Sequence, residues 1–257
     1  MRMRSLRVLV MGCLLTGTLW AEGDPFTGKW KMDPSKSTTV DEMKVDSAGG
    51  NKYALDLGAG MVETITPDGT DQPGLYGTTL AVTAEAPDRW KVVRKKDGTM
   101  ELTGNWTLSA DGKTLTDDYS EFDPKGEVTT HVLYKYQRTG GGSGFAGDWV
   151  STSQPTDPVE VEIGAWEGDG LSLTRRQVTR HVKFDGKDYA AEGANLPAGF
   201  GTSARRVDVH TVELTDKIGD KAVDTQKMTI SEDGKTLTVT YQPAGRTRPN
   251  VLVFERE

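Results

Sequence analysis

Apolar and polar residues alternate in short runs along most of the chain, and turn-forming residues separate these runs. Alternation with a period of two is typical of β-strands that bury one face. Asp-Gly between two such runs predicts a hairpin, because the turn requires positive φ angles. No window of about twelve residues holds a helical period, and only Asp33–Ser37 fits a short helical turn. Turns between strands are predicted at Asp68–Gly69, Asp97–Gly98, Asp111–Gly112, Pro124–Gly126, Asp185–Gly186, Gly219–Asp220, Asp233–Gly234 and Pro243–Gly245.

Three sequence markers occur twice, in the same order and at nearly the same spacing. Each copy begins with Phe-x-Gly-x-Trp, carries Ser-x-Asp-Gly-Lys-Thr-Leu-Thr near its end, and finishes with an aromatic strand that ends in arginine. A repeat of this kind indicates a duplicated domain. We therefore predict domains at residues 24–138 and 145–257, joined by a flexible linker at Thr139–Gly144. The markers are Phe26–Trp30, Ser109–Thr116 and Arg138 in the first copy, and Phe145–Trp149, Ser231–Thr238 and Arg256 in the second.

The meander of about eight short strands per copy suits an up-and-down barrel, which closes its own edges. Thirty glycines and an excess of Thr and Val also favour strands and tight turns over helices. The predicted fold class is all-β, with two tandem antiparallel up-and-down β-barrels.

Gly-x-Trp on the first strand and an arginine at the end of the last strand resemble the lipocalin and wider calycin superfamily. The resemblance implies that the tryptophan closes one end of the barrel, that the arginine packs across its ring, and that the glycine lets the backbone pass closely beneath the ring. The first copy also resembles an uncharacterised class of exported bacterial lipocalin-like proteins that begin Gly-x-Trp-x-x-Asp-x-x-Lys-Ser, here Gly28–Ser37; the second copy lacks the Asp and Lys-Ser part. Carried onto this chain, the closing residues are Gly28 and Trp30 with Arg138, and Gly147 and Trp149 with Arg256.

The N-terminus has the composition of an export signal. Met1–Arg7 carries three arginines, Val8–Trp20 is mostly apolar, and Ala21 precedes a polar stretch. This order is typical of a secretory signal peptide, here residues 1–21, so the mature protein is expected in the periplasm or outside the cell. The alternatives are a signal anchor, or a lipoprotein anchored at Cys13, which follows a lipobox-like Val-Met-Gly.

Composition excludes several classes of function. Cys13 is the only cysteine, so removal of the signal peptide leaves no thiol for a disulfide, a nucleophile or a metal ligand. The formal net charge is −7, and it becomes more negative once the N-terminal arginines are removed, which disfavours nucleic-acid binding. No apolar run of the mature chain is long enough to predict an integral membrane helix.

The motifs that resemble catalytic, cofactor or metal sites all have simpler explanations. His131, His181 and His210 occupy unrelated positions in the repeats, without a second histidine at metal-ligand spacing. Gly142–Gly147 matches a dinucleotide-binding pattern literally, but a strand is predicted after it where the pattern requires a helix. Ser143 lies in no nucleophile elbow. We therefore predict no catalytic residue, no metal and no cofactor.

The lumen and mouth of the barrels are the expected places for function, since an eight-stranded barrel holds either side chains or one small ligand. Tyr76 and Phe200 stand between glycines, and Tyr189 follows an Asp-Gly turn, which favours loops over a barrel mouth. We predict a non-catalytic protein that binds a small apolar or amphipathic ligand through Tyr76, Tyr189 and Phe200. The alternative is an extracellular or envelope interaction module with solid barrels. A calycin-type hydrolase or isomerase would need a nucleophile–base pair that the sequence does not supply.

Overall fold

The computed structural model describes residues 23–58, 61–152, 159–175, 178–193 and 196–257. The predicted signal peptide at residues 1–21, with Cys13, lies outside them. The described chain is almost entirely β-structure, and its helical element is the short 3-10 turn η1 (Leu75–Gly77). The predicted all-β class is therefore confirmed.

The two repeats place their strands in the same order along the chain. The first repeat contributes β1 (Gly28–Met32), β2 (Glu42–Ser47), β3 (Tyr53–Asp56), β4 (Val62–Ile65), β5 (Gln72–Pro73), β6 (Thr78–Ala86), β7 (Arg89–Lys96), β8 (Thr99–Leu108), β9 (Thr114–Phe122) and β10 (Val128–Gly140). The second contributes β11 (Gly147–Ser151), β12 (Glu160–Trp166), β13 (Gly170–Arg175), β14 (Val178–Val182), β15 (Tyr189–Ala190), β16 (Glu192–Gly193), β17 (Phe200–Asp208), β18 (Thr211–Ile218), β19 (Lys221–Ile230), β20 (Thr236–Pro243) and β21 (Asn250–Arg256).

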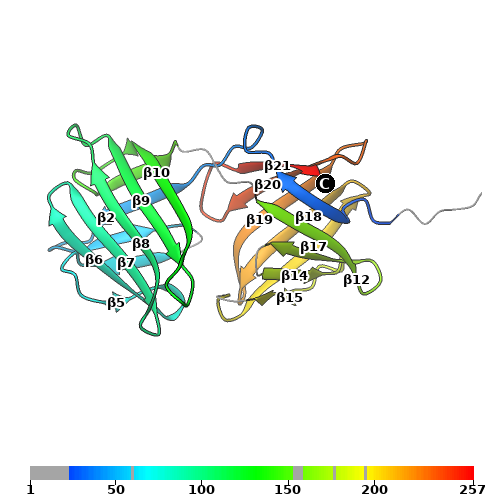
Figure 1. Ribbon diagram of the computed structural model, residues 1–257, viewed down its shortest axis with the longest axis horizontal. Helices are drawn as coiled ribbons and strands as arrows, with labels where there is room; N and C mark the ends of the chain where they lie inside the picture. The colour runs from blue at the N-terminus through cyan, green and yellow to red at the C-terminus, as the bar shows by residue number, and fades with distance from the viewer. Residues whose placement is uncertain (1–22, 59–60, 153–158, 176–177, 194–195) are drawn as a thin grey trace, which may run out of the picture.

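The strands form two antiparallel sheets, each curled into a barrel (Figure 1). Barrel I is the 10-stranded sheet β4-β3-β2-β11-β10-β9-β8-β7-β6-β5, and barrel II is the 11-stranded sheet β15-β17-β18-β19-β20-β21-β1-β12-β13-β14-β16. The segment after β4 meets β6 where Gly69 N donates to Val82 O at 2.8 Å, and the equivalent contact in barrel II joins Gly186 N to Ala204 O at 3.3 Å. Two tandem antiparallel barrels are thus confirmed. Their strands outnumber the expected eight partly because the two-residue strands β5, β15 and β16 add to the longer ones.

Most predicted turns join strands that pair with each other. The turns at residues 97–98, 111–112, 124–126, 219–220, 233–234 and 243–245 all connect neighbouring strands of one sheet. Asp97 and Gly98 show why the residue types matter, because both adopt positive φ angles, 51° and 81°. The turns at Asp68–Gly69 and Asp185–Gly186 differ, since each lies where its barrel closes and joins no hairpin.

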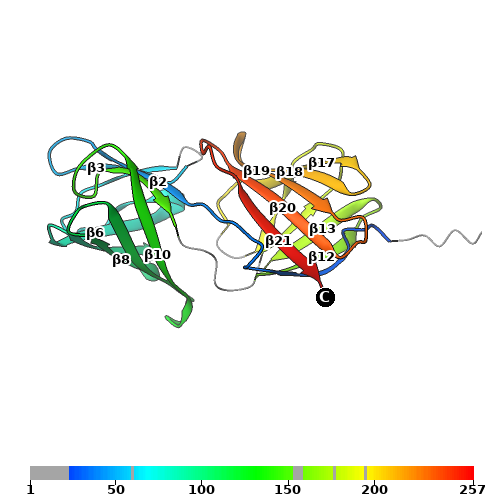
Figure 2. The same ribbon diagram turned by 90° about the horizontal axis from the view of Figure 1, so that it is seen from above.

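The two barrels exchange their first strands. β11, from the second repeat, lies between β10 and β2 in barrel I, and β1, from the first repeat, lies between β21 and β12 in barrel II. Figures 1 and 2 show β1, in blue, among the green to red strands of barrel II. The expected pairing of Trp30 with Arg138 and of Trp149 with Arg256 is wrong, because Trp30 pairs with Arg256 and Trp149 with Arg138. Residues 24–138 and 145–257 therefore each contribute to both barrels.

The exchange follows from the connection between the repeats. β10 and β11 form an antiparallel hairpin, with Gly140 paired to Asp148. The predicted linker, Thr139–Gly144, is therefore the end of β10 and part of the hairpin loop, in which Gly141, Gly142 and Gly144 adopt positive φ angles. Consecutive antiparallel strands joined by a short loop usually lie side by side. Pairing of β11 with β10 fills the place that β1 would take if each repeat closed its own barrel.

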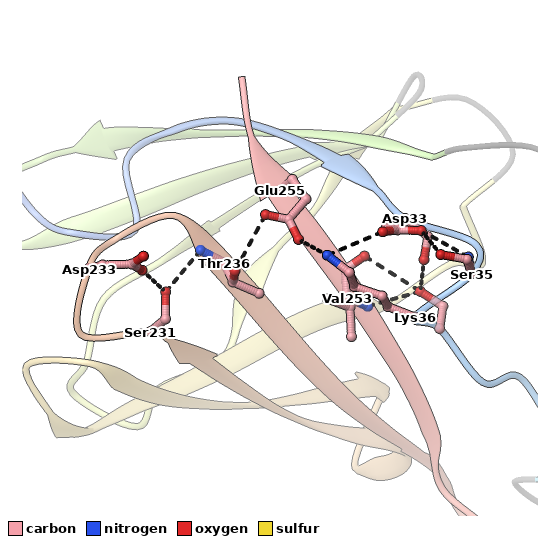
Figure 3. A network of polar contacts seen from close by, with 9 residues as sticks. Asp33, Ser35, Lys36, Ser231, Asp233, Thr236, Val253 and Glu255 are labelled. Atoms are coloured by element: carbon pink, nitrogen blue, oxygen red, sulfur yellow. Dashed lines mark hydrogen bonds and ion pairs between the residues drawn. The ribbon is translucent and has the colours of Figure 1, made fainter.

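The residues after β1 fix this segment on barrel II (Figure 3). Lys36 Nζ lies 2.8 Å from the Glu255 carboxylate on β21. Val253 N donates to Ser37 Oγ at 3.0 Å, and Ser37 Oγ donates to the Asp33 carbonyl at 2.8 Å. Asp33, Lys36 and Ser37 are the Asp-x-x-Lys-Ser part of the motif, which only the first repeat has. They hold the chain against β21 before it passes to β2 of barrel I.

Each exchanged segment supplies two large aromatic side chains to the core of the barrel that it joins. Phe26 and Trp30 are buried in the core of barrel II, and Phe145 and Trp149 in the core of barrel I. Full burial of a large apolar side chain contributes roughly 1.5–3 kcal/mol. The exchanged strands are therefore integral to both cores.

Candidate functional site

The tryptophan–arginine pairs close one end of each barrel. The Arg256 guanidinium lies 4.2 Å from the centroid of the Trp30 ring. Arg138 lies over Trp149 at the same distance, 4.2 Å. A cation–π contact of this kind contributes about 0.5–2 kcal/mol. Both rings are buried, so this end of each barrel is structural.

Each arginine also joins the other repeated markers to its tryptophan. Arg256 donates to the Gly234 carbonyl at 2.6 Å and to the Thr27 carbonyl at 2.6 Å. Arg138 donates to the Gly112 carbonyl at 2.8 Å. Gly112 and Gly234 belong to the repeated Asp-Gly turns. The three markers found in the sequence are therefore one closing unit in each barrel.

The glycine before each tryptophan makes room for the arginine. A Cβ added to Gly28 would lie 2.6 Å from Nη1 of Arg256, and one added to Gly147 would lie still closer to Nη1 of Arg138. Both glycines also have positive φ angles, 144° and 149°. These residues are glycine because the guanidinium occupies the space of a side chain.

Barrel I contains a cavity of about 260 Å³ in its lumen. Most of its lining is apolar, and its aromatic residues are Trp106, Tyr119, Tyr134 and Tyr136. The rings of Tyr119 and Tyr134 lie 5.7 Å apart and those of Tyr134 and Tyr136 lie 6.2 Å apart, so the three tyrosines form one continuous wall. A concave apolar and aromatic site with few polar groups is typical of small-molecule binding.

Gly104 keeps this cavity open. It is the sixth residue of β8, and its equivalent, the sixth residue of β19 in barrel II, is Gln226. A Cβ at Gly104 would lie 2.7 Å from Oδ1 of Asp117. The absence of a side chain at this position therefore leaves space that a glutamine occupies in the second barrel.

Asp117 is a buried polar residue with an unpaired oxygen in this cavity. Its exposed fraction is 8%, and no described residue supplies a hydrogen-bond partner to its Oδ1. Burial raises the pKa of Asp117 to about 7. A hydrogen bond between its carboxylate and the Trp106 side chain opposes the rise, and the nearby carboxylates of Asp118 and Asp41 add to it. An unsatisfied buried group costs about 1–3 kcal/mol. The equivalent fourth residue of β20 is Val239, so the second repeat avoids this cost.

The cation nearest to the cavity is already paired. The Arg94 guanidinium binds the Glu63 carboxylate with both nitrogens, at 2.8 and 2.7 Å. The Glu63 side chain is 2% exposed and that of Arg94 is 14% exposed. Asp41 also lines the cavity, and its carboxylate accepts a hydrogen bond from Tyr136 at 2.7 Å. Burial, followed by the Asp41 charge, raises the pKa of Tyr136, so its hydroxyl remains a donor.

Barrel II has the same kind of buried ion pair with its charges reversed. Arg180 Nη2 lies 2.9 Å from Oδ2 of Asp216, whose side chain is fully buried. Asp216 is the sixth residue of β18, as Arg94 is of β7. Arg180 faces Leu173 across the β13–β14 pair, as Glu63 faces Leu55 across β3–β4. The two barrels therefore have an ion pair at equivalent positions, but the acidic and basic residues have changed places between the two strands.

The polar groups in the lumen of barrel II largely satisfy one another. The cavity there has a volume of about 190 Å³. Gln226 crosses it and donates to Asp216 and to Asp224, each at 3.1 Å. Burial and the Asp216 charge raise the pKa of Asp224 to about 6. Nε of Arg180 has no partner among the described residues. This lumen is smaller than that of barrel I and is crossed by a polar network.

The three predicted ligand-binding residues lie outside the linings of both cavities. Tyr76 is in the 3-10 turn η1, with φ 57° and 45% of its surface exposed. Tyr189 is on β15 and donates to Asp185 at 3.0 Å. Phe200 begins β17, with the Arg180 guanidinium 5.7 Å from its ring centroid. The structure does not bring the three together in one site, although Phe200 contacts Arg180, which lines the cavity of barrel II. Their part in binding stays a prediction.

The described part of the chain contains no candidate metal site. Across residues 23–257, apart from the gaps given above, no group of three or more His, Cys, Asp and Glu could hold a metal ion. His131 contacts Asp118 at 2.7 Å on the surface, and His181 stacks on Trp166 at 4.9 Å. In the same ranges, no helix has the length and apolar character needed to cross a membrane.

Sequence reasoning missed Gly104 and Asp117, although a signal for both exists. Inward positions repeat every second residue, so Leu115, which is fully buried, places Asp117 on the inner face of β9. The same alternation from the buried Leu108 places Trp106 and Gly104 inward on β8. A carboxylate and a glycine at inward positions of a barrel indicate a cavity with a polar group in it.

In comparisons with known proteins, no family model, no curated protein and no solved structure matches the chain. Its description as a pair of antiparallel barrels with exchanged first strands therefore rests on strand order and register.

Proposed function

We propose that the protein is a non-catalytic binding protein that holds a small molecule with an apolar body in the lumen of barrel I. The cavity of about 260 Å³ carries this proposal. A cavity of about 150 Å³ with an apolar lining accommodates benzene. The lumen of barrel I therefore suits a molecule with one or two rings. Burial of the apolar surface of such a ligand contributes about 25 cal/mol per Å².

The lining of the cavity supports access from solvent. Leu57 lines it and is 37% exposed. Asp41 lines it and is also exposed. The cavity therefore reaches the surface beside these two residues, so a ligand can enter without disruption of the core around Trp149.

We further propose that the chain is a lipocalin-like protein exported to the periplasm or beyond. The closing units support the first part, because a Gly-x-Trp strand and a final arginine meet in both barrels, with the guanidinium 4.2 Å from the ring. The basic and apolar order of residues 1–21 supports the second. The exchanged first strands distinguish this protein from a simple series of two independent barrels.

The proposal is tested with 2-phenylethanol, a neutral one-ring probe, by isothermal titration calorimetry and ligand-observed NMR. We expect one binding site per chain. The double variant Gly104→Gln/Asp117→Val copies Gln226 and Val239 of barrel II, so it fills the cavity with a combination that the same fold accommodates. It should abolish binding, with folding checked by circular dichroism.

The matched control is Gln226→Gly, which changes only barrel II and should leave binding of the probe in barrel I intact. Native mass spectrometry of the protein purified from its own host supplies a second measurement. If the probe does not bind and no small molecule co-purifies, the binding proposal is rejected. An interaction module whose barrels work as solid units then becomes the better explanation.

A further inference from the structure

We propose that the ligand of barrel I is a small organic cation, an apolar or aromatic body carrying one protonated amino group, and that Asp117 is its counter-charge. This inference rests on the proposed function, since it names the ligand class of the same cavity. It is carried by one buried carboxylate oxygen without a partner, in a cavity lined by four aromatic rings whose one cationic side chain, Arg94, is already paired with Glu63.

The first observation is the unpaired oxygen. Only 8% of the surface of Asp117 is exposed, and within the described residues its Oδ1 accepts no hydrogen bond. A buried carboxylate oxygen in a ligand-sized cavity needs a donor. An ammonium group supplies up to three donors and a positive charge, and a charge-assisted hydrogen bond is stronger than a neutral one.

The second observation is the balance of charge around the cavity. The charged residues of the lining are Asp41, Arg94 and Asp117. Arg94 is neutralised by Glu63 through two short hydrogen bonds, at 2.8 and 2.7 Å. The ion pairs of the described chain include neither Asp41 nor Asp117. The cavity is therefore negative, with Asp41 at the exposed rim and Asp117 within, an arrangement that attracts cations and repels anions.

The third observation is the aromatic wall. Trp106, Tyr119, Tyr134 and Tyr136 all line the cavity that contains Asp117. Tyr134 pairs with Asp117 across the β9–β10 pair, so its ring lies beside the carboxylate. Aromatic faces attract cations within about 6 Å of the ring centroid. The body of the ligand and its charged group are thus recognised by the same set of rings.

Barrel II provides an internal comparison. The positions of Asp117 and Tyr134 are filled there by Val239 and Leu252, which face each other across β20–β21. Gln226 replaces Gly104, and its amide is already bonded to Asp216. At these positions barrel II therefore has neither the carboxylate nor the aromatic ring, and Gln226 fills the space that Gly104 leaves open in barrel I. The cation site belongs to barrel I.

The experiment compares three probes that share a phenyl ring on a short chain: 2-phenylethylamine, which is protonated at pH 8, neutral 2-phenylethanol, and anionic 3-phenylpropanoate. Affinities are measured by calorimetry on the full mature chain. We expect the amine to bind at least about tenfold more tightly than the alcohol, as one charge-assisted hydrogen bond implies, and the anion to bind most weakly. Asp117→Asn should reduce the amine-to-alcohol affinity ratio to about one. Asp88→Asn, exposed in the turn between β6 and β7, is the matched control and should preserve the ratio.

The outcomes separate the two proposals. If the alcohol binds and the amine binds no more tightly, the cation assignment is wrong while the binding function stands. Equal ratios for the wild type and Asp117→Asn would also reject Asp117 as the counter-charge. If none of the three probes binds, both this inference and the proposed function fail for ligands of this size. Unfolding curves of both variants ensure that the ratios are compared between folded proteins.

Discussion

Arg256, the residue before the C-terminus, lies 4.2 Å from the ring of Trp30 on the first strand of the chain. The two residues are also cross-strand partners in the β1–β21 pair. The other closing pair, Trp149 and Arg138, lies across the hairpin between the repeats. Each barrel is therefore completed by a strand from the other repeat. The stability of barrel II depends on Trp30 of the first repeat, and that of barrel I on Trp149 of the second.

Trp30→Ala should destabilise barrel II, although Trp30 belongs to the first repeat. Truncation of a buried tryptophan to alanine costs about 3–5 kcal/mol, and Trp30 is fully buried in the core of barrel II. Hydrogen exchange measured by mass spectrometry should show faster exchange in the strands of residues 160–256. Trp149→Ala is the matched variant and should affect residues 42–140. Loosening confined to the strands of the mutated repeat would contradict the exchanged topology.

A cut in the hairpin loop should leave the two fragments tightly associated. Cleavage between Gly141 and Gly142, through an engineered protease site, separates the repeats but leaves β1 in barrel II and β11 in barrel I. Size-exclusion chromatography should show one species with the mass of the intact chain. Two separate monomers would mean that each fragment closes on its own first strand. The uncut protein with the same inserted site is the control.

The buried Glu63–Arg94 pair should behave as a unit. Removal of one partner leaves an uncompensated charge in the core, so Arg94→Met should cost about 3–5 kcal/mol. The double variant Glu63→Leu/Arg94→Met should restore most of that stability, because an apolar pair replaces a desolvated one. Urea unfolding measures both. The neighbouring surface pair Lys95–Asp71, at 2.9 Å, supplies the control, and Lys95→Met should cost no more than about 1 kcal/mol.

Asp117 should make the folded protein less stable as pH rises from about 4 to about 7. Burial raises its pKa from 3.8 to about 7. In that interval the unfolded chain releases the proton and the folded protein keeps it, so the contribution is complete below pH 3.8 and lost above the folded pKa. Each unit of the shift corresponds to about 1.4 kcal/mol.

The measurement is urea unfolding at several pH values for the wild type and Asp117→Asn. The difference in unfolding free energy between the two should vary with pH in this interval. Asp224, whose pKa is raised to about 6, contributes a trend of the same sign in both proteins and cancels in the comparison. Asp88→Asn, exposed in the turn between β6 and β7, is the control. A wild-type and an Asp117→Asn curve that run parallel across this range would contradict the buried-carboxylate assignment.

The strand pattern, most turns and the two-barrel class could be predicted from the sequence because each depends on local information. Alternation places residues on one face, and positive φ angles at Asp97 and Gly98 require a particular kind of turn. The closing residues could be predicted for the same reason, since Gly28 and Trp30 recur in the second copy as Gly147 and Trp149.

The partner of each closing residue could not be predicted in this way. The two copies of the closing unit are nearly identical, so either arginine fits either tryptophan with the same local geometry. The choice is made by the loop at residues 139–146, which lets β11 pair with β10, and by Lys36, which binds Glu255. The glycine-rich composition of that loop suits a flexible linker as well as a hairpin, so composition alone does not decide between them.

The cavity was difficult to predict for a different reason. Tyr76 and Phe200 stand out in the sequence because glycines flank them, which is a signal about backbone conformation. Gly104 and Asp117 stand out only after the register of two strands is fixed by buried neighbours such as Leu115. Whether a lumen is filled depends on the total volume of all inward side chains, which cannot be inferred from any single residue.

The exchanged first strand also sets the order in which the two barrels can close during synthesis. β1 is synthesised long before its partner strand β21: Arg256 donates to the Pro25 carbonyl across 231 residues of sequence. Contacts of such separation form late. Barrel I can close once β11 has been made. In barrel II, β1 remains without one of its two neighbours until β21 has been made. A chain truncated before Arg256 lacks the guanidinium that covers Trp30, so barrel II closes only after β21 has been made.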